Sequence, residues 1–167
     1  APDSTRLRAL FDLDWEYGNI EYPEGATYSG FPGQNGRWTD ESLDAIARRK
    51  KELQLPLEVV NSIDRSALSA TDQLNYDLFR KNSLDGIDGT RFPGEYLAIG
   101  PRGGPQGLSE TLAQNPIATV ADYEDILSRL DGIPAVLEQT TVLLQKGLAA
   151  GVMWPKITLR DVPGQVA

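Results

Sequence analysis

The sequence predicts a mainly helical, all-α fold in which antiparallel helices are separated by two long loops rich in glycine and proline. Apolar residues recur at intervals of three and four along most of the chain, which is the spacing of one face of an α-helix. Glycine and proline gather in the stretches 23–38 and 93–107, where they favour turns. The 167 residues, 40% hydrophobic and 24% charged, suit one globular domain or a large part of one.

The first predicted helix ends before Pro23, because proline cannot continue a helix. A single apolar stripe runs along it, comprising Leu7, Leu10, Phe11, Trp15, Gly18 and Tyr22. This stripe needs a partner against which it can be buried. Residues 23–38 follow as a long loop, since they include Pro32 and the turn-forming pair Asn35-Gly36.

Two capping signals place the next helices. Thr39 is expected to cap the second helix, which Pro56 breaks or restarts. Its inward residues are Leu43, Ile46, Ala47 and Leu53. Ser69 and Asp72 form a Ser-x-x-Asp box that predicts the start of a third long helix, which ends near residues 86–89.

A second capping box opens the C-terminal helical region. Thr119 and Asp122 start a helix that Gly132 is expected to end. Pro134 suits the first turn of a further helix, and Gly151 is placed to cap its C-terminus. We therefore expect two antiparallel helices with a tight connection.

The segments around these helices are less regular. Residues 93–105 form the second loop, in which 95–99 is the only plausible extended run. Residues 155–162 indicate a new element, and we expect more protein to follow Ala167. Residues 1–167 are then the N-terminal helical portion of a larger protein.

The charge balance disfavours nucleic acid and anionic membranes as partners. The chain has 16 basic and 24 acidic residues, a net charge of −8, which repels phosphate groups unless basic residues cluster. The one basic run, 48–51, lies in a helical pattern beside acidic residues and is interpreted as a solvated face. No apolar run is long enough for a membrane span.

The absence of histidine and cysteine bounds the chemistry of this chain. Imidazole and thiolate are the usual zinc ligands, and histidine is the commonest general base. We therefore expect no catalytic residue, no metal site and no cofactor in this chain. The chain alone should neither bind zinc tightly nor hydrolyse peptides.

One loop offers a candidate binding group. Arg102 lies in a segment rich in proline and glycine, where its guanidinium can present two donors to a substrate carboxylate. A structural salt bridge and a solvent-exposed side chain are the alternatives. The glycines of this loop match neither a dinucleotide fingerprint nor a P-loop.

Several segments in order resemble a bacterial family, domain of unknown function 885. They are 22–27 (Tyr-Pro-Glu-Gly-Ala-Thr), 63–69 leading into 72–77, 120–127 with Leu130, and 147–151 before Trp154-Pro155. Members of the family are longer, mostly helical and often exported, and they carry a His-Glu-x-x-x-x-His-His-like segment in their later half. That segment makes them similar to gluzincin zinc metallopeptidases.

The resemblance implies that this chain is an incomplete part of a larger helical metallopeptidase-like fold. Its helices would line or cover a substrate cleft, while zinc and the catalytic residues lie in the downstream part of the parent protein. The loop 96–107 would add a carboxylate clamp, with Tyr96, Arg102, Gly103 and Gly104 as substrate-binding residues for a peptide. The start Ala1-Pro2-Asp3 is compatible with a mature end left by cleavage, so an exported, periplasmic protein is expected.

Three alternatives remain open for the role of this chain. The chain is the cleft-forming part of a peptidase, a stand-alone helical binding or scaffold module without enzymatic activity, or one of two chains that assemble into an enzyme. Exposed apolar residues near the end, at 152–154, 157, 159 and 162, predict self-association or contact with the downstream catalytic part. The alternative is that this segment folds back onto the helix 134–150.

Overall fold

The computed structural model describes residues 1–101 and 103–166 of the chain and confirms the all-α fold. In these residues the regular elements are helical, and Gly100 and Gly103 form an isolated antiparallel bridge. The chain divides into two compact units. The first unit comprises Ala1–Gly18 and Asp44–Phe92, and the second comprises Asn19–Leu43 and Pro93–Ala167.

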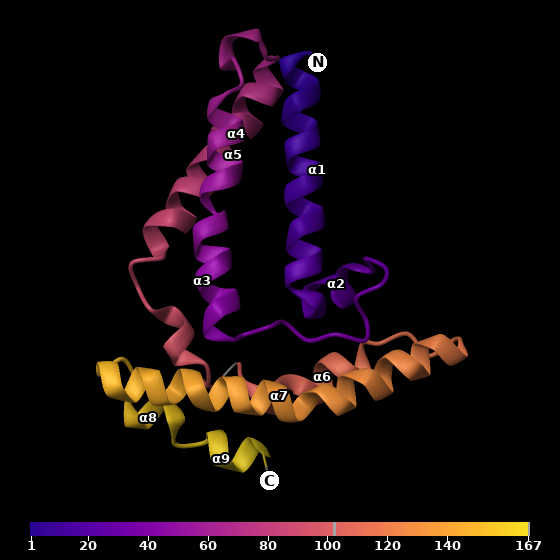
Figure 1. Cartoon of the computed structure of the whole chain (residues 1–167), viewed down its shortest axis with the longest axis vertical. Helices are drawn as coiled ribbons and strands as arrows, with labels where there is room; N and C mark the ends of the chain where they lie inside the picture. Colours follow the sequence, from indigo (N-terminus) through magenta and orange to yellow (C-terminus); the bar gives the residue numbers. More distant parts are fainter. Residues whose placement is uncertain (102, 167) are drawn as a thin grey trace. The chain divides into compact units, whose positions relative to one another are not determined.

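The first unit is built from α-helices, of which α1 (Asp3–Glu21) and α5 (Ala70–Gly89) are the longest (Figure 1). The others are α3 (Leu43–Glu52) and α4 (Gln54–Asn61), with a short 3-10 helix, η1 (Arg65–Ala67), before α5. Its core consists of the buried residues Leu7, Leu10, Val60, Ile63, Leu68 and Tyr76. The rings of Phe11 and Phe79 extend this core, with centroids 5.1 Å apart.

The predicted stripe of α1 is buried only over its first half. Leu7 and Leu10 belong to the core, and Phe11 packs against it. Trp15, one turn further on, is 59% exposed, and Tyr22 is also exposed. The core of the first unit therefore contacts the stripe only over the N-terminal half of α1, as far as Phe11.

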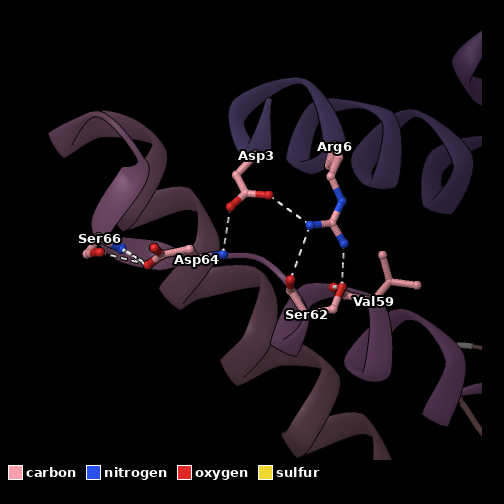
Figure 2. A network of polar contacts seen from close by, with 6 residues as sticks. All are labelled: Asp3, Arg6, Val59, Ser62, Asp64 and Ser66. Carbon is pink, nitrogen blue, oxygen red and sulfur yellow. Dashed lines mark hydrogen bonds and ion pairs between the residues drawn. The ribbon is translucent and has the colours of Figure 1, made fainter. Parts of the chain in front are cut away.

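A polar network fixes the start of α1 to the turn after α4 (Figure 2). Arg6 donates to Asp3 Oδ1 at 2.8 Å and to Ser62 Oγ at 2.6 Å. The backbone N–H of Asp64 donates to Asp3 Oδ2 at 3.0 Å, while Asp64 itself accepts from the N–H of Ser66 at 2.9 Å. The N–H of Asp64 and the guanidinium of Arg6 both lower the pKa of Asp3, since they stabilise its charged form.

The second helix starts later than the sequence predicts. Thr39 does not cap it, because both the N–H and the hydroxyl of Thr39 donate to the Glu24 carboxylate, and α3 begins at Leu43. Ile46 is buried as expected, but Ala47 is exposed. Pro56 lies in the first turn of α4, where its missing N–H would have had no intrahelical partner.

The second unit contains one long helix, α7 (Val120–Ala150), drawn in orange in Figure 1, and several short ones. The short elements are α2 (Pro23–Ser29), η2 (Gly94–Leu97), η3 (Pro105–Gly107), α6 (Leu108–Ala113), α8 (Lys156–Leu159) and α9 (Val162–Val166). A new element does open after Pro155, as predicted.

Both predicted loops contain helix. Residues 23–38 were expected to be irregular, but Pro23 occupies the first turn of α2, a position that its fixed φ favours. Gly30 then ends α2 in the left-handed conformation, with φ of 75°. Residues 95–99 do not form an extended run either, since η2 covers Gly94–Leu97.

The two helices predicted on either side of Gly132 are one continuous helix. Gly132 and Pro134 both lie inside α7. Trp38 occupies this place on the helix: its indole N–H donates to the carbonyl of Arg129 at 2.7 Å, and a Cβ on Gly132 would lie 2.9 Å from its ring. Gly132 therefore serves as a close-packing position and does not end the helix.

The N-terminus of α7 confirms the predicted capping box. Thr119 accepts from the N–H of Asp122, and Asp122 accepts from the N–H groups of Thr119 and Ala118 at 2.7 and 2.9 Å. These hydrogen bonds lower the pKa of Asp122 below its ordinary value of 3.8, and the bond from the N–H of Thr119 has the largest effect. The C-terminus confirms the Gly151 cap, with φ of 69°.

Acid should loosen this capping box. Because the folded-state pKa of Asp122 is lowered, its stabilising effect is complete above the ordinary value of 3.8 and is lost as the pH falls through the lowered value. Amide hydrogen exchange at Ala118 and Thr119, relative to the intrinsic rate at each pH, should therefore accelerate in that range more than exchange at Leu143, inside α7. Equal acceleration at both places would contradict the role assigned to Asp122.

Candidate functional site

Three segments of the second unit line an open, apolar pocket with a volume of about 280 Å³. They are the C-terminal half of α7, the segment around η2, and the stretch from Met153 to Leu159 at the end of α8. Its apolar walls include Tyr96, Ile99, Leu144, Leu148, Met153 and Trp154. We call it the Trp154 pocket.

Close packing at Gly147 builds one wall of this pocket. A Cβ at Gly147 would lie 3.0 Å from Tyr96 Cβ and 3.1 Å from the Tyr96 carbonyl oxygen, so only glycine lets Tyr96 approach α7 this closely. The carbonyl of Gly147 also accepts the N–H of Val152 at 2.8 Å, which reverses the chain at the end of α7. This reversal brings Trp154 back, and its indole N–H donates to the Leu97 carbonyl at 3.3 Å.

The pocket is open to solvent and apolar. Leu148 is 65% exposed and Met153 is also exposed, although both line it. The polar side chains at its edge are Thr141, whose hydroxyl already donates to the Leu137 carbonyl at 2.8 Å, and Gln145. A site of this composition holds an apolar group by burial, with few polar contacts to orient it.

Three of the four predicted substrate-binding residues lie in the described part of the chain. Tyr96 lines the Trp154 pocket. Gly103 and Gly104 are not among its lining residues but shape the preceding loop: Gly103 pairs with Gly100, and Gly104 has φ of 132°, which favours glycine. Arg102 lies outside the described residues, so the predicted carboxylate clamp stays a prediction.

A glutamine holds this loop in shape. Gln106 Nε2 donates to the Gly100 carbonyl at 2.6 Å and to the Gly103 carbonyl at 3.2 Å. Gly100 in turn lies under Trp154, since a Cβ there would be 3.4 Å from the indole nitrogen. The loop therefore supports the pocket through Trp154.

The apolar residues near 152–162 are partly packed beside α7 and partly exposed. Leu159 lines the Trp154 pocket together with Leu144 of α7, so the segment does fold back beside that helix. Val162 is buried, whereas Ile157 is exposed. Self-association through the exposed part stays a prediction.

Arg129 is the residue that sequence reasoning missed. It lies in α7 at 0% exposure, although arginine in a helix is normally solvated. Its guanidinium donates to the Arg37 carbonyl at 2.9 Å, to Asn115 Oδ1 at 2.6 Å, to Thr27 Oγ1 at 2.7 Å and to the Pro23 carbonyl at 3.2 Å. It therefore joins α2, the segment after it and the end of α6 to α7.

All these acceptors are neutral. Burial lowers the pKa of Arg129, an effect that the charges of Glu24 and Asp125 partly offset. The guanidinium also stacks on the ring of Trp38, 5.1 Å from its centroid, which contributes a cation–π interaction. Sequence gives no signal for this role, because Arg129 stands between Ser128 and Leu130 like an ordinary surface residue.

The residues of this chain do not fit a zinc site. The sequence contains no histidine and no cysteine. Nor do the residues that the structure describes bring three or more aspartate or glutamate side chains together in a group that could hold a metal ion. No chemical step can be derived through a metal from these residues.

None of the helices in the described part of the chain combines the length and the hydrophobicity that a membrane span requires.

The fold and the site define a class: a mainly helical protein with an open apolar pocket on a long helix. A family model described as "Bacterial protein of unknown function (DUF885)" matches residues 23–167, which includes all the elements that form the pocket. The chain therefore belongs to the DUF885 family, as the ordered motifs of its sequence indicate. No curated protein matches the chain.

Proposed function

We propose that this chain is the helical, substrate-holding portion of a zinc-dependent peptidase, and that the Trp154 pocket binds an apolar side chain of the peptide. The observation that carries the proposal is the open apolar pocket between Tyr96, Trp154 and α7. Membership of the DUF885 family supports it, because the resemblance described above implies a histidine–glutamate segment, similar to that of gluzincin metallopeptidases, in the later half of the family's members. Catalysis and zinc binding belong, in this proposal, to residues outside this chain.

The pocket suits a side chain better than a whole ligand. Its walls offer apolar contact, and Thr141 uses its hydroxyl proton within α7. Burying a leucine or phenylalanine side chain stabilises a complex by about 1.5–3 kcal/mol when burial is complete and by less in an open pocket. Binding should therefore be weak and selective for apolar residues.

Leu148 provides the test. We expect short blocked peptides with a central leucine or phenylalanine to shift the indole N–H signal of Trp154 in NMR spectra, and peptides with a central serine to shift it less. Leu148→Gln should weaken binding about fivefold, because it places a polar amide on the wall. Leu148 is exposed in the free chain, so this change should leave folding intact.

Leu137→Gln is the matched control, since Leu137 is an exposed leucine of the same helix outside the pocket. It should leave affinity unchanged. Equal affinities for serine and leucine peptides, or equal effects of the two variants, would contradict the proposed peptide site.

A second measurement tests whether catalysis resides outside this chain. The chain with added zinc should not hydrolyse peptides, whereas the full reading frame should, if it encodes a downstream histidine–glutamate motif. Chelator-sensitive hydrolysis by the pure chain would overturn the proposal. A helical module that works alone would bind the same peptides but would have no such downstream motif.

A further inference from the structure

A second apolar pocket lies in the first unit, with a volume of about 440 Å³. It is formed by one face of α1, by the end of α3 and by α4. Its apolar walls are Leu10, Leu13, Leu53, Leu55, Pro56 and Val59. Leu13 and Leu55 are 64% and 58% exposed, so the pocket presents apolar surface to solvent.

Two carboxylates also line this pocket, and they differ in their partners. Glu52 Oε2 accepts from the Tyr17 hydroxyl at 2.7 Å and from Arg48 at 2.8 Å. Its charge is thus already compensated. Asp14, one turn before Tyr17 on α1, has no hydrogen-bond or ion-pair partner among the residues that the structure describes.

The surroundings of Asp14 disfavour its charge. Asp14 is itself exposed, but the apolar side chains that line the pocket with it reduce its hydration, and this partial desolvation raises its pKa. A cation placed beside Asp14 would replace the lost hydration, while an anion would be repelled by both carboxylates. The chain's net charge of −8 adds a general attraction for cations.

The apolar walls select what the cation must carry. A metal ion is a poor occupant, since among the described residues that line the pocket Asp14 alone offers an unpaired carboxylate, and the remaining walls are largely hydrocarbon. An alkyl chain would bury the exposed surfaces of Leu13, Leu55 and Val59. Apolar surface and an unpaired carboxylate together fit an alkylammonium ion.

We propose that this pocket binds a small alkylammonium ligand, with its ammonium group on the Asp14 carboxylate and its alkyl chain against Leu13, Leu55 and Val59. This site goes beyond the proposed peptide-holding role and does not depend on it, since the Trp154 pocket is made of other residues.

The experiment uses n-hexylamine, which is protonated at neutral pH, and the uncharged hexanol. In methyl NMR spectra of the whole chain, both should shift Leu13, Leu55 and Val59, with hexylammonium binding about fivefold more tightly at low salt. Salt at about 0.5 M should reduce this preference, because the charge pair is accessible to ions.

Asp14→Asn is the decisive variant, and Asp12→Asn is its matched control. Asp12 is an exposed aspartate of α1 outside the pocket. Asp14→Asn should abolish the preference for hexylammonium over hexanol, whereas Asp12→Asn should retain it. Because the folded-state pKa of Asp14 is raised, its ionised form disfavours folding above the ordinary value of 3.8, so the amide should not destabilise the chain at neutral pH.

Three results would overturn the proposal: equal affinity for the amine and the alcohol, equal effects of the two variants, or shifts by hexylammonium only outside the pocket. Shifts confined to the Trp154 indole would place the ligand in the other pocket and would likewise contradict it. A failure of peptides to bind at Trp154 has no bearing on this test.

Discussion

Replacing Arg129 with methionine should lower the free energy of unfolding of the second unit by roughly 3 kcal/mol or more, because it leaves several buried acceptors without a donor. These acceptors are the Arg37 and Pro23 carbonyls and the side chains of Asn115 and Thr27. Methionine fills much of the space but donates no hydrogen bond. The loss should be read by urea denaturation of the whole chain, monitored by circular dichroism.

Two further variants separate the causes. Lys146→Met removes a positive charge from an exposed position of the same helix, and we expect a change of less than about 0.5 kcal/mol. Arg129→Lys retains the charge but lacks the planar fork, so it should still be clearly destabilising. Equal stabilities of the Arg129→Met and Lys146→Met proteins would show that the buried network contributes little.

Gly147→Ala should destabilise the second unit by about 3 kcal/mol, at the upper end of the range for overpacking, because the atoms it would meet are mostly backbone. The new Cβ would lie 2.7 Å from the Val152 carbonyl oxygen and 3.1 Å from that of Tyr96. Relieving these contacts requires the chain reversal after α7 to move. The NMR signal of the Trp154 indole should shift as a result, and peptide binding should weaken.

Gly25→Ala is the matched control for this change. Gly25 lies inside α2, also in the second unit, and a Cβ there would meet no atom within 4 Å. Alanine is the better helix former, so this variant should gain up to about 1 kcal/mol. If both alanine variants were stabilised, the close approach of Tyr96 to α7 would be refuted.

Local signals in the sequence predicted several helix ends correctly. The Ser69 and Thr119 caps and the Gly151 C-cap are all present. Each depends on atoms only three to five residues apart, so the chain around it suffices to determine it. The order of motifs also indicated the DUF885 family, which the family model confirms.

Local signals failed where distant residues contribute. Gly132 and Pro134 predicted a break, yet α7 continues through them with Trp38 packed against Gly132. Thr39 looks like a cap, but Glu24 accepts its hydrogen bonds instead. In both cases a tertiary contact outweighs a weak local preference.

The candidate sites show the same difference between local signals and tertiary contacts. Sequence singled out both Tyr96 and Trp154 but did not bring them together, because Trp154 reaches the loop of Tyr96 only through the reversal of the chain after Gly151. It could not distinguish Asp14 from Asp12, because only the packing of α1 beside α4 places one of them on an apolar pocket.

The sequence by itself determined the all-α class, the capped helix ends and the family, because helical periodicity and capping are properties of neighbouring residues. Only the tertiary structure decided which side chains are buried and what they contact. Arg129 is the clearest case: its acceptors lie as much as 106 residues away, so its burial follows from how α2 packs on α7 and from nothing in its own neighbourhood.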